Sequence, residues 1–207
     1  VGAGDEVIVP SYTFAATAAE VYACGATPVF ADVVGPHDLS LDPVDVEARI
    51  TERTKAVCAV HFGGYAAPVD ALQAVCDRHG LAFLEDAAHA PLTPPHGRSA
   101  AYSFFSNKVL SAGEGGLLAT DDDDVAVAAR EQRARLGYRL DDVRAAWLRV
   151  RFRRLHEDIA ARRALTHRYR ELLAGVEGVS VPYTGAAVDE SSCYVMPSLL
   201  DDPARQA

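Results

Sequence analysis

Residues 100–120, AAYSFFSNKVLSAGEGGLLAT, contain two short apolar runs, 101–106 and 115–120, with no helical pattern between them. Before this stretch, similar runs alternate with helix-like segments. The earlier runs are EVIVP (6–10), TPVFADV (27–33), AVCAVHF (56–62) and LAFLED (81–86), and the helix-like segments are 14–24, 43–51 and 69–79. Each run is too short for a helix and is rich in Val, Phe or Tyr, which favours strands. The alternation predicts an α/β fold whose mostly parallel sheet is covered by helices on both faces.

A second group of helices is expected after residue 120. The acidic run in TDDDDVAVAARE is typical of a helix N-terminus, where it caps free amides and complements the helix dipole. A long helical pattern then extends from Asp141 to Leu173, and AGVEGVSVP ends it and begins a strand. These features predict a large domain over 1–140, a connecting helix over 141–175 and the start of a smaller domain over 176–207. The chain is expected to be a fragment that lacks parts at both ends.

Composition excludes several classes of function. The chain has 207 residues, of which 49% are hydrophobic and 24% charged, with a net charge of −9. That negative charge argues against nucleic acid or an anionic membrane surface as a partner. The sequence contains no apolar run of membrane-spanning length, and its four cysteines form no CxxC pair. We therefore expect a reduced, cytoplasmic protein.

The chain has only two lysines, Lys55 and Lys108, against eighteen arginines. Lys108 follows the apolar run 101–106, whereas Lys55 is expected to be a surface cation. An amine can lose its proton and form a Schiff base, which a guanidinium cannot. The scarcity of lysine therefore makes Lys108 a candidate catalytic residue.

Other reactive side chains follow the predicted strands at the same edge. Asp86 and His89 end the stretch LEDAAHA, Ser103 lies within the run before the lysine, and the turn PSYTFAAT after strand 6–10 carries Phe14. Open α/β sheets bind ligands at the carboxyl ends of their strands. Pyridoxal phosphate (PLP) needs a lysine, a carboxylate against its ring nitrogen, phosphate donors and a flat ring partner. A nucleotide-binding Rossmann protein is set aside because no GxGxxG follows the first strand.

The chain resembles the DegT/StrS-type sugar aminotransferases, which are fold-type-I PLP enzymes. The resemblance covers essentially the whole chain in order, through GAGDEVIVPSYTFAATA, GATPVFADV, TERTKAVCAVHFGG, CDRHGLAFLEDAAHA, YSFFSNKVLSAGEGG, RLDDVRAA and RRALTHRYRELLAGVEGV. It implies that region 1–140 is a PLP-binding large domain with a seven-stranded type of sheet, and that the small C-terminal domain is incomplete.

The resemblance also implies roles for individual residues. Lys108 would bond to PLP and move the proton between substrate and cofactor, Asp86 would pair with the pyridine nitrogen, and His89 would reach the phenolic oxygen. Phe14 would stack on the ring and Ser103 would bind the phosphate. Purely structural interpretations stay open: a surface lysine, an aspartate that caps a turn, a structural histidine, a strand serine and a core phenylalanine.

The resemblance further implies transfer of an amino group from glutamate or glutamine to a keto-sugar or keto-cyclitol, in a homodimer or a dimer with a paralogue. Several features differ from the family pattern: the N-terminal phosphate-binding loop is not seen, the segments APLTPPHGRSAAYSFF and RARLGYRLDD are shortened, and Cys193 replaces an aromatic residue. These differences support an alternative, in which the chain is a non-catalytic partner or remnant of a full-length aminotransferase.

Overall fold

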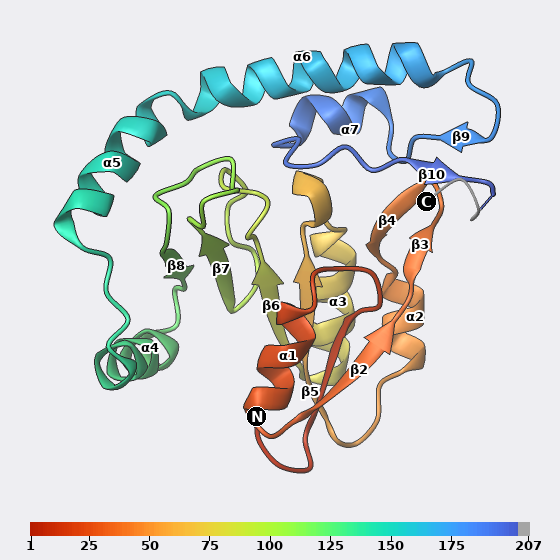
Figure 1. The fold of residues 1–207 in the computed structure, drawn as a ribbon. Coiled ribbons are helices and arrows are strands. Elements are labelled where there is room, and N and C mark those ends of the chain that lie inside the picture. Colours follow the sequence, from red (N-terminus) through yellow and green to blue (C-terminus); the bar gives the residue numbers. More distant parts are fainter. Residues whose placement is uncertain (203–207) are drawn as a thin grey trace.

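The computed structural model describes residues 1–202, and its centre is a six-stranded sheet (Figure 1). In spatial order the strands are β2 (Thr27–Ala31), β1 (Glu6–Pro10), β5 (Thr54–Val60), β6 (Ala82–Asp86), β7 (Ser99–Ser103) and β8 (Gly116–Ala119). Neighbours from β2 to β7 are parallel, and β8 is antiparallel to β7. The predicted α/β fold with a mostly parallel sheet is confirmed, as is the loss of alternation at 100–120. Within residues 1–202 the central sheet has six strands, one from each of the six apolar runs, where the resemblance implied a seven-stranded type of sheet.

Helices cover both faces of the sheet, as predicted. On one face, α2 (Pro43–Ala48) and α3 (Val69–His79) pack over a core that includes Ile8 and Phe83. On the other face, α1 (Ala16–Ala23) packs against a second set that includes Val7 and Val9. Consecutive residues of a strand point to opposite faces, so the uninterrupted apolar run of β1 supplies both cores.

The helix predicted after the acidic run is α4 (Asp123–Leu136). The Asp122 side chain accepts a hydrogen bond from the Val125 amide at 3.0 Å, which confirms the predicted cap. The helix ends at Gly137, which adopts the left-handed conformation with φ 69°.

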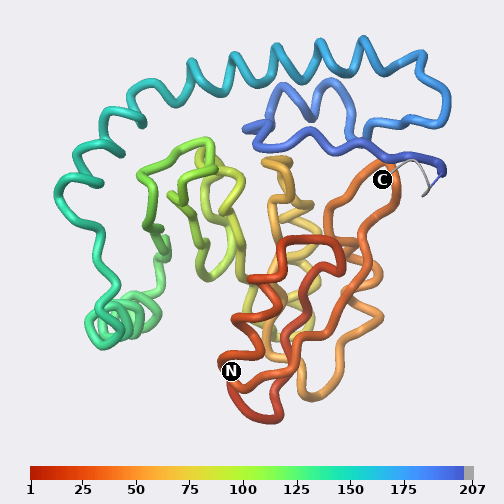
Figure 2. Tube along the Cα trace, in the orientation of Figure 1, coloured from red at the N-terminus to blue at the C-terminus, as the bar shows by residue number. Residues whose placement is uncertain are grey.

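The long helix predicted over 141–175 is two helices, α5 (Asp142–Arg153) and α6 (Leu155–Leu173), which follow one another along a curved path (Figure 2). The helix is interrupted at Arg154, a turn residue with φ −100° and ψ −1°. Immediately after the break, Leu155 and Ile159 pack against a cluster that includes Phe104 and Leu110. Packing after the break, not the helical pattern, therefore decides where α6 begins.

The remaining elements are small. A hairpin of β3 (Val33–Gly35) and β4 (Asp38–Leu41) follows β2, and a short 3-10 turn, η1 (Phe62–Gly64), follows β5. After α6 come β9 (Val179–Ser180), α7 (Gly185–Glu190) and β10 (Leu199–Leu200). These last elements lie within 176–207, the range predicted to begin a small domain, and residues 203–207 of that range lie outside the described part. No helix within residues 1–202 is both long and apolar enough to cross a membrane.

Candidate active site

Three parallel strands bring candidate residues to one edge of the sheet. Strand β5 leads into η1, β6 ends at Asp86, and β7 ends at Ser103, five residues before Lys108. Because β5, β6 and β7 are parallel, their carboxyl ends share one edge. The fold therefore places Asp86, His89 and Lys108 where open α/β sheets bind ligands.

Asp86 is held by two hydrogen bonds. Its Oδ2 accepts from the Thr17 hydroxyl at 2.8 Å, and its Oδ1 accepts from the Ala88 amide at 3.0 Å. Thr17 is buried on α1, so this bond ties the helix on one face of the sheet to the end of β6. Thr17 was not a sequence candidate, although it lies in the quoted turn PSYTFAAT.

His89 is 9% exposed, and its Nδ1 accepts a hydrogen bond from the Gly63 amide at 3.2 Å. Because Nδ1 is the acceptor, the neutral ring carries its proton on Nε2. Burial, and after it the nearby charge of Lys108, lower the pKa of His89 to about 4, while Asp86 acts in the opposite direction. The imidazole is therefore neutral at neutral pH, with an Nε2 donor available.

Lys108 is half-buried in the turn after β7, where its amide donates to the Phe105 carbonyl at 2.9 Å. Burial lowers the pKa of its amine, and Asp86 partly opposes that effect. The Nζ atom lies 4.6 Å from the ring centroid of Tyr194, which stacks on His89 with centroids 4.2 Å apart. The structure thus brings Lys108, His89 and Asp86 into one cluster, as the sequence predicted.

The other two predicted residues lie differently. The Ser103 hydroxyl accepts a hydrogen bond from the Phe105 amide at 3.3 Å. Phe14 is 73% exposed, so the alternative that it belongs to the core is wrong. From the same turn, Tyr12 packs against Phe62 with ring centroids 4.9 Å apart, and Phe62 in turn lies edge-on to His89 with centroids 6.1 Å apart. The ring-stacking role of Phe14 stays a prediction.

A second buried cluster lies beside Asp86. His61 is fully buried, its Nδ1 accepts from the Ala67 amide at 3.1 Å, and its Nε2 lies 3.2 Å from Glu85 Oε1. Glu85 Oε2 accepts from the amides of His96 (2.7 Å) and Gly97 (2.6 Å). Burial alone would raise the pKa of Glu85, but these hydrogen bonds, that from His61 first, bring it below its usual value. The pair joins the end of β5 to β6, so His61 has a structural role.

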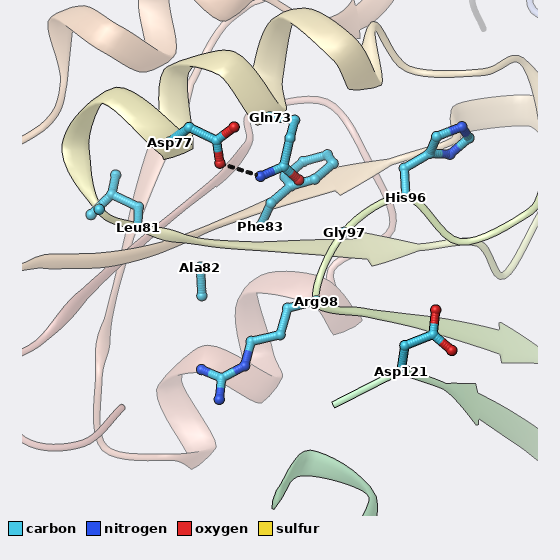
Figure 3. A pocket seen from close by; sticks show the side chains of 10 residues that line it. Gln73, Asp77, Leu81, Ala82, Phe83, His96, Gly97, Arg98 and Asp121 are labelled. Atoms are coloured by element: carbon cyan, nitrogen blue, oxygen red, sulfur yellow. Dashed lines mark hydrogen bonds between the residues drawn. The ribbon is translucent and has the colours of Figure 1, made fainter. Parts of the chain in front are cut away.

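A cavity of about 710 Å³ lies at the opposite, amino edge of β6 (Figure 3). Gln73 and Asp77 of α3 are hydrogen-bonded to one another in its wall, and Arg98 and Asp121 line the other side. None of the predicted site residues lines this cavity. The candidate active site is therefore the cluster at the carboxyl edge.

Comparison with known proteins supports the resemblance to sugar aminotransferases. A model of the DegT/DnrJ/EryC1/StrS aminotransferase family matches residues 1–206. The dTDP-3-amino-3,4,6-trideoxy-alpha-D-glucose transaminase of Streptomyces venezuelae is 41% identical over 211 aligned residues, which cover 91% of this chain and 55% of that protein. The L-glutamine:scyllo-inosose aminotransferase of Streptomyces griseus is 46% identical over 142 residues, which cover 65% of this chain and 33% of that protein.

Solved structures agree in fold. The crystal structure of DesV from S. venezuelae superposes with a TM-score of 0.88 at 37% identity, covering 99% of this chain and 60% of DesV. The structure of 3-amino-5-hydroxybenzoic acid synthase gives a TM-score of 0.83 at 31% identity, covering 94% of this chain and 56% of the synthase. The chain spans about half the length of most of these relatives, and a third of some.

Proposed function

Because this chain belongs to the DegT/DnrJ/EryC1/StrS aminotransferase family, we propose that it binds PLP at the carboxyl edge of its sheet and takes part in amino transfer to a keto-sugar or keto-cyclitol. One observation carries the proposal: the half-buried amine of Lys108 and the carboxylate of Asp86 belong to one cluster, in which burial lowers the pKa of the amine. A lysine amine that loses its proton more easily and a fixed carboxylate are two groups that PLP chemistry requires of a protein.

The residues present fit the cofactor. Both oxygens of Asp86 are oriented by donors, Thr17 and the Ala88 amide, so the carboxylate presents a fixed negative charge. His89 keeps an Nε2 donor while its Nδ1 is engaged by the Gly63 amide. When bound, PLP supplies an electron sink for the carbon that gains or loses the amino group.

We assign the following roles to the side chains. Lys108 Nζ would bond to the cofactor and then accept and return the proton during transfer, for which a lowered pKa is favourable. Asp86 would hold a proton on the pyridine nitrogen, and His89 Nε2 would donate to the phenolic oxygen. Ser103 would bind the phosphate and Phe14 would stack on the ring.

The amino donor and the partner are also parts of the proposal. Glutamine is named in the S. griseus relative and supports glutamate or glutamine as donor. We propose a homodimer, or a dimer with a longer paralogue, in the cytoplasm. Exposed apolar side chains on α5, among them Val143 at 81% and Trp147 at 58%, support a covering partner. We further propose that the large domain covers 1–140 and that 176–207 begins a second domain.

The test uses the two lysines of the chain as their own control. The purified chain is mixed with PLP, reduced with borohydride, digested and mapped. We expect the label on Lys108, little on Lys55, and none at position 108 in Lys108→Arg, which keeps the charge but cannot form the bond. Equal labelling of both lysines, or no label on Lys108, would overturn the proposal and favour the non-catalytic partner.

A further inference from the structure

Tyr194 contacts both His89 and Lys108, although it lies 86 positions beyond the lysine in the numbering and belongs to the C-terminal part of the chain. Its segment, Ser191–Val195, crosses the carboxyl edge of the sheet and is bonded to η1. The Gly63 carbonyl accepts from the amides of Tyr194 at 2.8 Å and Val195 at 3.3 Å.

The neighbouring Gly64 permits this close approach. Its φ is +94°, its carbonyl accepts from the Ser192 amide at 3.2 Å, and an added Cβ would lie 2.1 Å from the Ser192 hydroxyl oxygen. That hydroxyl in turn donates to the His89 carbonyl. The segment is therefore hydrogen-bonded both to η1 and to the backbone of His89 in the candidate site.

Helix α6 holds the same segment from its other side. Arg163 Nε donates to the Ser191 carbonyl at 2.8 Å, and Arg162 Nη1 lies 3.4 Å from the Cys193 carbonyl. Cys193 itself is buried and adopts a left-handed φ of 50°. Such a backbone is costly for a residue with a side chain, and it persists here within a segment bonded on both sides.

We propose that Tyr194 is a positioning residue for Lys108: its ring, fixed against His89 by the docked segment 191–195, holds the amine at the carboxyl edge and limits its access to water. The catalytic meaning of this contact rests on the proposed function, but the contact itself does not. If Tyr194 only filled space between the segments, removing its ring would not change the reactivity of Lys108 relative to that of Lys55.

Two physical effects act on the amine. A ring face within about 6 Å attracts a lysine ammonium and so fixes its position. The same ring displaces water from the amine, and removal from water is the main cause of the lowered pKa of Lys108. Loss of the ring should therefore free the amine and expose it.

Competitive acetylation tests the proposal without any cofactor. Trace acetic anhydride labels the native chain across a pH series, and mass spectrometry gives the labelling of Lys108 relative to Lys55. The limiting rate reports how accessible the unprotonated amine is, so in Tyr194→Leu we expect it to rise severalfold at Lys108, with Lys55 unchanged. Tyr194→Phe keeps the ring and should match the wild type. Tyr169→Leu removes an exposed tyrosine of α6 and serves as the matched control.

An unchanged or lower rate at Lys108 in folded Tyr194→Leu would overturn the proposal, as would Tyr194→Phe behaving like Tyr194→Leu. If Tyr194→Leu does not fold, reductive ¹³C-methylation of the wild-type chain decides. The methyl protons of Lys108 should resonate upfield of those of Lys55, and the difference should vanish in urea; coincident signals in the folded chain would refute the contact. Neither assay involves PLP, so failure of cofactor binding is distinguished from failure of this inference.

Discussion

Protonation of His89 should make the folded state sensitive to mild acid. The pKa of this ring falls from 6.5 to about 4 on folding. Below pH 6.5 His89 becomes protonated in the unfolded chain but stays neutral in the folded chain. The contribution of His89 to the free energy of unfolding is therefore fully present above that pH and falls as the pH approaches 4. Between pH 7.5 and pH 5 the linkage relation gives a loss of about 2 kcal/mol in the free energy of unfolding.

Urea unfolding at the two pH values measures this loss. We compare the wild type with His89→Gln, whose side-chain oxygen can still accept from the Gly63 amide, and with His156→Gln, which replaces an exposed histidine. The difference between pH 7.5 and pH 5 should shrink by about 2 kcal/mol in His89→Gln and stay unchanged in His156→Gln. Carboxylates with lowered pKa values, such as Glu85, lose their contribution at lower pH and so contribute little in this window. An identical pH dependence in the wild type and His89→Gln would refute the reasoning.

Substitutions at three further positions test other contacts. Thr17→Val removes the hydroxyl bonded to Asp86 and should cost about 1–2 kcal/mol in urea unfolding and reduce borohydride-trapped PLP, whereas Thr17→Ser should restore both. Gly64→Ala should cost about 2 kcal/mol, measured by thermal unfolding, because the new Cβ meets the hydroxyl oxygen of Ser192; a stability equal to the wild type would show that the segment docks less closely. Leu155 is only 1% exposed, so Leu155→Ala should leave a cavity beside α6 and lower the free energy of unfolding by about 3 kcal/mol. A loss below about 1 kcal/mol in urea unfolding would contradict the observed packing of α6.

The sequence by itself determined the sheet, most of its helices and the identity of the candidate residues. Apolar runs of strand length depend on local spacing, and the cap at Asp122 depends on residues three positions apart. The scarcity of lysine singled out Lys108, and parallel strands necessarily bring their carboxyl ends to one edge. These features depend on residues close together in the sequence or on the order of the strands, so the sequence alone is enough to predict them.

Only the tertiary structure decided which side chains complete the cluster. Thr17 reaches Asp86 across 69 residues, and Ser192 reaches the His89 carbonyl across 103. The break at Arg154 and the exposure of Phe14 are likewise set by what packs nearby, not by periodicity. Contacts between distant segments depend on how whole helices and strands pack together, which local sequence patterns do not predict. Tyr194 therefore contacts Lys108 only in the folded chain, where hydrogen bonds from α6 and to η1 fix segment 191–195 at the carboxyl edge of the sheet.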